Sequence, residues 1–192
     1  MRGPANYTDA SRRAIVVPLK RFDRAKQRLR SNANVDATRI AHDLAAAVLA
    51  AAAPQPTIVL CEDDSVAAFA RRRGADVITS RARSLNEAVQ HAYVQLGDDF
   101  DQIIVVHGDL ATPDGIATFE PTVGVTIVVD HHGRGTNVLA LPTRLDFRFA
   151  YGDDSARRHR REAARLTLAC SVIIDSPWSF DIDDADDLSA LT

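Results

Sequence analysis

Short apolar runs alternate along this chain with segments whose apolar residues recur at helical spacing. The runs predict buried strands over residues 14–19, 57–60, 77–79, 103–106, 123–129 and 138–141, with a further short run at 172–174. The helical spacing predicts helices over residues 36–53, 64–73, 85–96 and 154–166. This alternation, without an internal repeat, predicts an α/β domain with a mostly parallel central sheet flanked by helices. The loops that follow the strands then lie at one edge of the sheet, where ligands bind.

The composition indicates a soluble protein without a general affinity for polyanions. The chain has 192 residues, of which 46% are hydrophobic and 26% charged, and its net charge is −3. That charge gives no pull toward nucleic acid or anionic membranes, and no apolar run approaches the ~20 residues of a membrane span. Residues 1–13 are polar and lack the apolar core of a signal peptide. We expect a flexible tail over 1–13, a single domain over 14–192, and a cytoplasmic location.

Several common catalytic devices are missing from the sequence. The two cysteines, Cys61 and Cys170, exclude a disulfide framework and a thiolate zinc site, and neither has a Gly-rich or His-adjacent setting. The sequence contains neither a G-x-S-x-G elbow nor a P-loop. His131 and His132 are adjacent, a poor spacing for two ligands of one metal ion, so we interpret them as turn residues. Covalent catalysis is therefore unsupported.

Cations and carboxylates follow the predicted strands. The cations after the first strand could clamp a triphosphate or form a solvated basic loop, and both interpretations stay open: Lys20, Arg21, Lys26 and Arg28. Asp109 follows strand 103–106, where a metal-bound phosphate would sit in such a sheet. Asp181 and Asp183 alternate in F-D-I-D and share one face of an extended segment, where they could bind Mg²⁺. The acids that follow are interpreted as a solvated helix start: Asp184, Asp186 and Asp187.

Two Gly-rich corners flank strand 138–141 and could hold a small anion, although ordinary turns would have the same composition. Thr136 lies in the first corner, and Ser155 lies where a helix should begin. His159, one turn further, either faces the same pocket or covers the helix. If the anion were a phosphomonoester that accepts a nucleotidyl group, its second pKa of about 6 would make it largely dianionic at neutral pH. Its attack would then require orientation and cations rather than a general base.

Six segments in this order resemble the guanylyltransferases of coenzyme F-420 biosynthesis, over residues 16–188. They are V-V-P-L-K with R-A-K-Q-R-L, S-L-N-E-A-V, H-G-D-L, D-H-H-G-R-G-T-N-V-L, Y-G-D-D-S-A-R-R-H and F-D-I-D-D-A-D-D-L. The resemblance implies a Rossmann-like nucleotidyltransferase fold and transfer of GMP from GTP, with release of pyrophosphate, to a small phospho-acid. Phosphoenolpyruvate is the favoured acceptor and 2-phospho-L-lactate the next.

The resemblance also implies roles for individual residues. The implied Mg²⁺ ligands are Asp109, Asp181 and Asp183, and with the lysines they form the catalytic set. The residues near the nucleotide are Lys20, Lys26, Leu85 and Asn86, and those that hold the acceptor's phosphate and carboxylate are Thr136, Gly152 and Ser155. The implied partners are GTP and a phospho-acid, without nucleic acid or membrane, and apolar helix surfaces could support a homodimer.

The sequence departs from the family pattern at several points. Ala111 and Thr112 replace the usual Pro-Leu after H-G-D-L, Arg134 replaces a threonine, and Ala185 replaces a helix-starting proline. The interval from Asp109 to Asp130 is short, so we expect the helix there to be reduced to a turn. Two alternatives stay open: a nucleotide-sugar glycosyltransferase of related fold, and a catalytically inactive GTP-binding paralogue. The glycosyltransferase would need a D-x-D motif after a strand in the middle of the sequence, which Asp109 does not provide.

Overall fold

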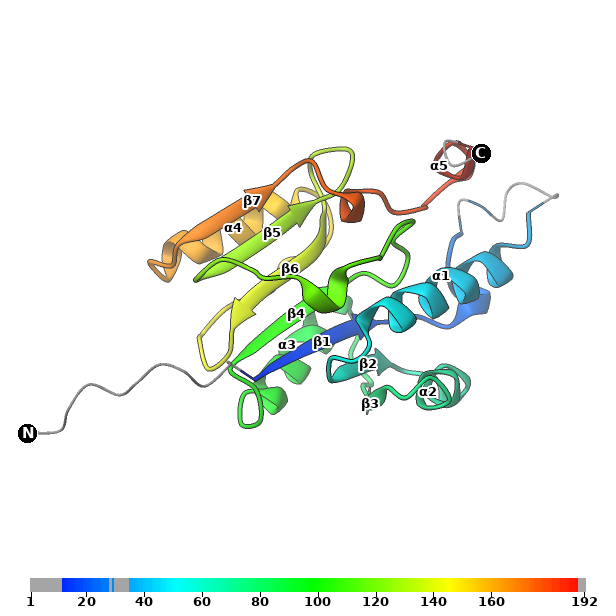
Figure 1. Cartoon of the computed structure of the whole chain (residues 1–192), viewed down its shortest axis with the longest axis horizontal. Coiled ribbons are helices and arrows are strands. Elements are labelled where there is room, and N and C mark those ends of the chain that lie inside the picture. Colours follow the sequence, from blue (N-terminus) through cyan, green and yellow to red (C-terminus); the bar gives the residue numbers. More distant parts are fainter. Residues whose placement is uncertain (1–11, 28, 30–34, 190–192) are drawn as a thin grey trace, which may run out of the picture.

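One twisted sheet forms the centre of the molecule (Figure 1). The computed structural model describes residues 12–27, 29 and 35–189. Within them the sheet has seven strands in the order β3-β2-β1-β4-β6-β5-β7. The strands are β1 (Arg13–Pro18), β2 (Thr57–Cys61), β3 (Asp76–Thr79), β4 (Gln102–Val106), β5 (Val125–Val129), β6 (Thr136–Pro142) and β7 (Cys170–Ile173). β6 pairs antiparallel with β4 and β5, whereas the other pairings are parallel, as the mostly parallel prediction required.

Helices cover both faces of the sheet. They are α1 (Ala37–Ala52), α2 (Asp64–Arg71), α3 (Leu85–Leu96), α4 (Ser155–Arg165) and α5 (Ala185–Ser189), with short 3-10 helices η1 (Phe22–Arg24), η3 (Ile116–Thr118) and η4 (Pro177–Ser179). α1 and α2 pack on one face, and α3 and α4 on the other. The first three α-helices begin after polar residues whose side chains accept backbone N–H bonds: Asp36, Asp63 and Ser84. The predicted α/β architecture is thus confirmed.

The central strands are buried on both faces, which explains their continuous apolar runs. In β1, Ile15 and Val17 belong to the core beneath α1 and α2, while Ala14 and Val16 belong to the core beneath α3 and α4. Successive side chains of a strand point to opposite faces, so both faces demand apolar residues here. Among the described helices none is long and apolar enough to cross a membrane.

The boundaries differ from the predictions at the edges of the sheet. β1 includes Arg13, which we had placed in the tail, and residues 1–11 of that tail lie outside the described part of the protein. β6 extends back to Thr136, before the predicted start at 138, and β7 begins at Cys170 rather than at 172. The segment between Asp109 and β5 contains only the 3-10 helix η3 among regular elements, as its short length predicted.

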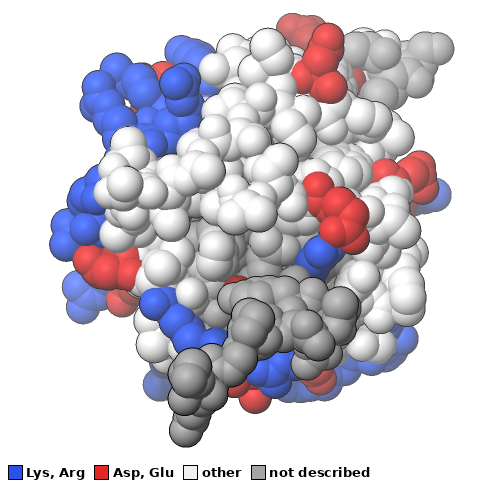
Figure 2. Space-filling model, turned by 60° about the vertical axis from the view of Figure 1, so that its left-hand side comes forward, with Lys and Arg blue, Asp and Glu red and all other residues white. Residues whose placement is uncertain are grey.

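Charged side chains are unevenly distributed over the surface. Figure 2 shows basic groups gathered at the upper left of one face and acidic groups at its top and right, with a largely uncharged area between them, while both kinds mix along the left and lower edges. The arginines concentrated in one segment of the sequence are exposed on α4: Arg157, Arg158, Arg160, Arg161 and Arg165. The acidic residues near the C-terminal end of the sequence lie elsewhere, next to the edge of the sheet where β1, β2 and β4 end.

Candidate active site

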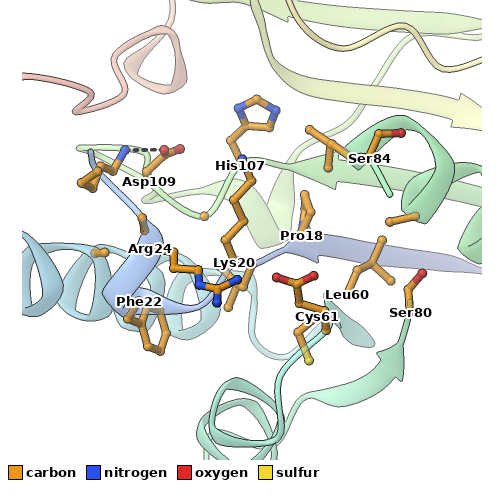
Figure 3. Close-up of a pocket in the computed structure, with 18 of the residues that line it drawn as sticks. Pro18, Lys20, Phe22, Arg24, Leu60, Cys61, Ser80, Ser84, His107 and Asp109 are labelled. Carbon is orange, nitrogen blue, oxygen red and sulfur yellow. Dashed lines mark hydrogen bonds and ion pairs between the residues drawn. The ribbon is translucent and has the colours of Figure 1, made fainter. Parts of the chain in front are cut away.

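A pocket of about 710 Å³ opens where β1, β2 and β4 end. Its lining comes from the loops after these strands and from the start of α3, and it includes Lys20, Arg24, Lys26, Glu62, Ser84, His107 and Asp109 (Figure 3). The position is the one at which open α/β sheets bind ligands, and the volume falls within the range of small-molecule and cofactor sites. The pocket is therefore the strongest candidate for a nucleotide site in the described residues.

The three predicted metal-binding aspartates meet at one side of this pocket. Asp109, Asp181 and Asp183 each offer a carboxylate oxygen within 4.8 Å of the others. The backbone brings them together, because the N–H of Ala111 donates to the carbonyl of Phe180 at 2.9 Å and that of Ile182 to Asp109 at 3.2 Å. The segment after β4 thus pairs with the C-terminal segment as a short antiparallel bridge.

Lys26 neutralises part of this negative charge. Its Nζ donates to Asp109 Oδ2 and, at 3.2 Å, to Asp183 Oδ1. Burial alone would lower the pKa of Lys26, but the two carboxylates outweigh it and raise that pKa. Burial and the neighbouring Asp109 raise the pKa of Asp181, against a hydrogen bond from Asn137 that lowers it. A cation held by the three carboxylates would relieve the repulsion that contributes to the raised pKa of Asp181.

The loop that carries Asp109 packs closely against the residue after β1. A Cβ on Gly108 would lie 2.3 Å from Leu19 Cδ2, so a larger residue would require the leucine side chain to move. Lys26 itself adopts a left-handed φ of 55°, an unfavourable conformation for a residue with a Cβ. Lys26 thus makes its contact with Asp109 from an unfavourable backbone conformation.

Two of the predicted acceptor residues, Thr136 and Ser155, form a second, buried cluster with His159. Thr136 Oγ1 lies 3.1 Å from His159 Nδ1. Ser155 Oγ donates to the same Thr136 Oγ1 at 3.2 Å. The backbone N–H of Ala150 donates to His159 Nε2 at 3.0 Å, so the neutral imidazole carries its proton on Nδ1 and donates to Thr136. Thr136 Oγ1 thus accepts twice, which leaves its own proton for a further acceptor next to this side chain, which is 1% exposed. Gly152 stands at the neighbouring corner with a φ of 109°.

Several predicted residues have other partners than expected. Asn86 does not line the pocket; its amide donates to the carbonyl of Tyr151 at 3.1 Å and accepts the N–H of the same residue. Its contact with the nucleotide stays a prediction, while its visible role is to hold the corner next to Gly152. Lys20 lines the pocket, Arg21 pairs with Asp23, and Arg28 lies outside the described residues.

Sequence reasoning gave Asn137 no role, yet it holds the C-terminal segment in place. Its Nδ2 donates to the carbonyls of Trp178 and Ser179 and to Asp181 Oδ1, each at 3.1 Å. Asn137 follows Thr136 after the first Gly-rich corner, and only its burial to 2% exposure in the structure indicates that it has a positioning role. In the sequence, the only sign of this role was an amide side chain next to a predicted acceptor residue.

The interpretation of Asp187 as a solvated residue was wrong, whereas the interpretation of His131 and His132 as turn residues is confirmed. Asp187 is not solvated: it is 7% exposed, and its Oδ2 accepts the N–H groups of Asp183 and Asp184, while Asp184 Oδ1 accepts the N–H of Asp187. This reciprocal pair caps α5. His131 and His132 lie in a turn, and their ligand atoms and that of Asp187 all lie within 4.8 Å of one another. Two histidines that are neighbours in the sequence can therefore still face the same point in space.

Known proteins resemble the chain along nearly its whole length. The family model described as "Guanylyl transferase CofC like" matches residues 13–192. A phosphoenolpyruvate guanylyltransferase of Chloroflexus aurantiacus is 30% identical over 197 residues, which covers 91% of this chain and 91% of the relative. Those of Roseiflexus castenholzii and Mycolicibacterium gilvum are 32% and 31% identical and cover 90% and 92% of this chain and 84% and 87% of theirs.

Solved structures agree in fold at much lower sequence identity. A protein of Desulfovibrio desulfuricans, provisionally described as a nucleotide-diphospho-sugar transferase, matches with a TM-score of 0.73 at 16% identity, covering 95% of this chain and 87% of that one. A nucleotidyl transferase from Methanothermobacter matches with a TM-score of 0.65 at 15% identity, covering 95% and 96%. These establish the nucleotidyltransferase fold. Because the family model spans residues 13–192 and the curated relatives align with most of the chain, this protein belongs to the CofC-like guanylyl transferase family.

Proposed function

We propose that this guanylyltransferase transfers GMP from GTP to the phosphate of a small phospho-acid, with Mg²⁺ and release of pyrophosphate, in coenzyme F-420 biosynthesis. Phosphoenolpyruvate is the acceptor we favour, because three relatives are named phosphoenolpyruvate guanylyltransferase. The next candidate is 2-phospho-L-lactate. One observation carries the proposal. Asp109 and Asp183 line the nucleotide-sized pocket, and Asp181 is hydrogen-bonded to Asn137, the neighbour of Thr136 in the acceptor cluster.

The aspartate cluster fits a Mg²⁺ ion. Asp109 Oδ1 is buried and has no hydrogen-bond partner among the described residues, which leaves a carboxylate oxygen that a cation would satisfy. An all-oxygen set with few protein carboxylates is the kind that Mg²⁺ prefers. Asp109, Asp181 and Asp183 would hold the ion, and it would supply positive charge to the phosphate oxygens of the nucleotide.

The lysines support the nucleotide side of the reaction. Lys20 and Lys26 both line the pocket, and their ammonium groups can stabilise the charge that develops on the departing pyrophosphate. For this role Lys26 has to leave Asp109 and Asp183, its partners in this structure. Because the side chain of Lys26 is only 5% exposed, this exchange takes place inside the pocket rather than in solvent.

The acceptor cluster supplies orientation rather than a base. Burial lowers the pKa of His159 to about 4, so the ring is neutral at pH 7 and holds Thr136 by a donated hydrogen bond. The hydroxyl proton of Thr136 is then directed to the acceptor, and the glycine at 152 lets a ligand approach the backbone. A dianionic phosphate held there can attack without losing a proton.

Pyrophosphate release tests the proposal directly. The full-length protein, loaded with Mg²⁺ and GTP, is incubated with phosphoenolpyruvate, 2-phospho-L-lactate, or no acceptor, and the nucleotide product is identified by mass spectrometry. We expect acceptor-dependent release and a GMP-linked phospho-acid, fastest with phosphoenolpyruvate. No release with either acid in a folded sample would refute catalysis, and equal release without an acceptor would indicate hydrolysis instead.

A further inference from the structure

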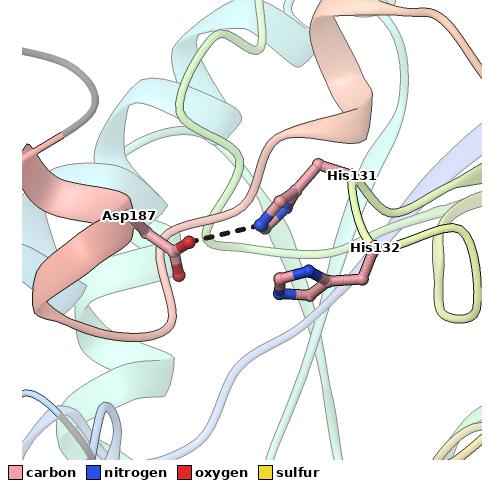
Figure 4. Close-up of side chains that lie close together, drawn as sticks. All are labelled: His131, His132 and Asp187. Carbon is pink, nitrogen blue, oxygen red and sulfur yellow. Dashed lines mark ion pairs between the residues drawn. The ribbon is translucent and has the colours of Figure 1, made fainter.

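A group of ligand atoms lies beside the pocket, at the turn between β5 and β6. His131 and His132 from this turn meet Asp187 of α5 (Figure 4), and their ligand atoms all lie within 4.8 Å of one another. His131 Nε2 lies 3.2 Å from Asp187 Oδ1, and the centroids of the two imidazole rings are 3.8 Å apart. Small side-chain rotations would bring all three onto one ion.

We propose that His131, His132 and Asp187 form a second metal site, which binds a transition metal ion such as Zn²⁺. Two imidazole nitrogens and one carboxylate oxygen are a ligand set that zinc uses in proteins, with water in the remaining position. Imidazole suits Zn²⁺, Co²⁺ and Ni²⁺, whereas Mg²⁺ prefers oxygen ligands. The donor set therefore distinguishes this site from the cluster of Asp109, Asp181 and Asp183, which offers carboxylates alone.

The surrounding residues orient two of these ligands. Asp187 Oδ2 accepts two backbone N–H groups, from Asp183 at 2.8 Å and Asp184 at 3.0 Å, which leaves Oδ1 directed at His131. On its other side His131 Nδ1 lies 3.6 Å from Asp181 Oδ1, and its ring packs on Phe180 at a centroid distance of 4.6 Å. Metal-binding histidines are commonly held by a carboxylate at the second ring nitrogen, which is the place of Asp181 here.

An ion at this site would connect two parts of the active centre. The histidines lie in the turn that leads into Thr136, whereas Asp187 follows directly on the segment that carries Asp181 and Asp183. α5 is a helix of five residues held by its capping pair and a small apolar cluster. The added bond would fix this C-terminal segment against the β5–β6 turn.

Metal binding can be measured without any substrate. The chelator-treated full-length protein is titrated with Zn²⁺ by calorimetry and with Co²⁺ by visible absorption, both in excess Mg²⁺ to saturate the aspartate cluster. We expect one Zn²⁺ per molecule and a Co²⁺ spectrum typical of nitrogen and oxygen ligands. His132→Ala should weaken Zn²⁺ binding by more than about tenfold, since even the partners behind metal ligands contribute that much.

Two control variants locate the ion. His91→Ala removes an exposed histidine on α3 and should leave Zn²⁺ affinity unchanged. Asp109→Asn alters the aspartate cluster and should also retain the zinc. Unchanged Zn²⁺ affinity in His132→Ala would overturn the proposal, as would loss of zinc from Asp109→Asn, because the ion would then lie on the aspartates. Circular dichroism of each variant establishes that it is folded, and none of these outcomes depends on guanylyl transfer.

Discussion

At the scale of single residues, Lys26 is the side chain that balances part of the negative charge of the aspartate cluster in this structure. Its ammonium contacts Asp109 and Asp183, so the protein supplies its own counter-ion to the cluster. The left-handed backbone at Lys26 costs about 1–2 kcal/mol, which the two charged contacts offset. A Mg²⁺ ion held by Asp109, Asp181 and Asp183 would take over this role, and Lys26 would then be free to contact the phosphates of a nucleotide.

Asp109→Asn should abolish most of the activity and preserve the fold. The change removes one charge from the aspartate cluster, and we expect turnover to fall by at least about 100-fold, the usual effect of losing one charge-stabilising group. The lost ion pair with Lys26 is offset by weaker repulsion on Asp181, whose pKa Asp109 raises. Pyrophosphate release and thermal unfolding measure the two effects.

The matched control is Asp98→Asn, an exposed aspartate just after α3. It should change neither turnover nor unfolding. Activity of Asp109→Asn close to that of the control would show that the metal assignment is wrong.

The buried His159 should make stability depend on pH. Its pKa is lowered from 6.5 to about 4, chiefly by burial and next by His107. Above about pH 6.5 this histidine is neutral in both the folded and the unfolded protein, and the full stability is present. As the pH falls to about 4, His159 becomes protonated in the unfolded protein but stays largely neutral in the folded one. The free energy of unfolding therefore falls by about 3 kcal/mol.

Urea unfolding at pH 7 and near pH 4.5 would measure this loss, with His159→Gln as the comparison. The free energy of unfolding of the variant should fall less between the two pH values, because glutamine does not titrate. Equal losses in both proteins would show that other groups account for the acid sensitivity.

At the scale of elements, burial decided what the sequence could predict. β1 and β4 are apolar because both faces are covered, so continuous runs located them to within one residue. β6 begins with buried polar residues, Thr136 and Asn137, which interrupt an apolar pattern although they belong to the strand. β7 lies at the edge of the sheet with Cys170 exposed, so its first residues lack the apolar signal.

Asn137 lets β6 position the C-terminal segment, and its replacement should loosen that connection. Asn137→Ala leaves two carbonyl groups and Asp181 without their donor, and we expect unfolding to become easier by about 1–3 kcal/mol. Turnover should fall as well, because Asp181 loses a partner that fixes its carboxylate. Urea unfolding and pyrophosphate release would measure the two effects.

Asn137→Leu serves as the comparison, because it retains the side-chain volume and removes only the amide. Similar destabilisation in both variants would identify the hydrogen bonds as the cause. If the leucine variant were as stable and active as the wild type, the amide would have no positioning role.

At the scale of the whole molecule, the antiparallel strand β6 brings the two halves of the site together. β1, β2 and β4 end at the pocket that we assign to the nucleotide. β6 starts beside the end of β4, with the N–H of His107 donating to the carbonyl of Asn137 at 3.0 Å. The sequence could place Asp109 and Thr136 at strand ends. It could not predict that Asn86 would bind Tyr151 or that His131 would meet Asp187, because local patterns carry no information on such distant pairs.

Because the two halves of the site lie at different strands, a substitution in one half should affect mainly the substrate that binds there. Thr136→Val keeps a β-branched side chain of similar size but loses the hydroxyl that we assign to the acceptor, so the KM for the phospho-acid should rise by about 10- to 100-fold. The KM for GTP should stay nearly constant. Lys20→Met keeps much of the apolar stem in the pocket and loses the charge, so it should raise the KM for GTP and leave that for the phospho-acid unchanged. Steady-state kinetics with each substrate varied in turn would measure both. If Thr136→Val raised the KM for GTP instead, the acceptor half would not lie at the start of β6, and the division of the site along the sheet would be wrong.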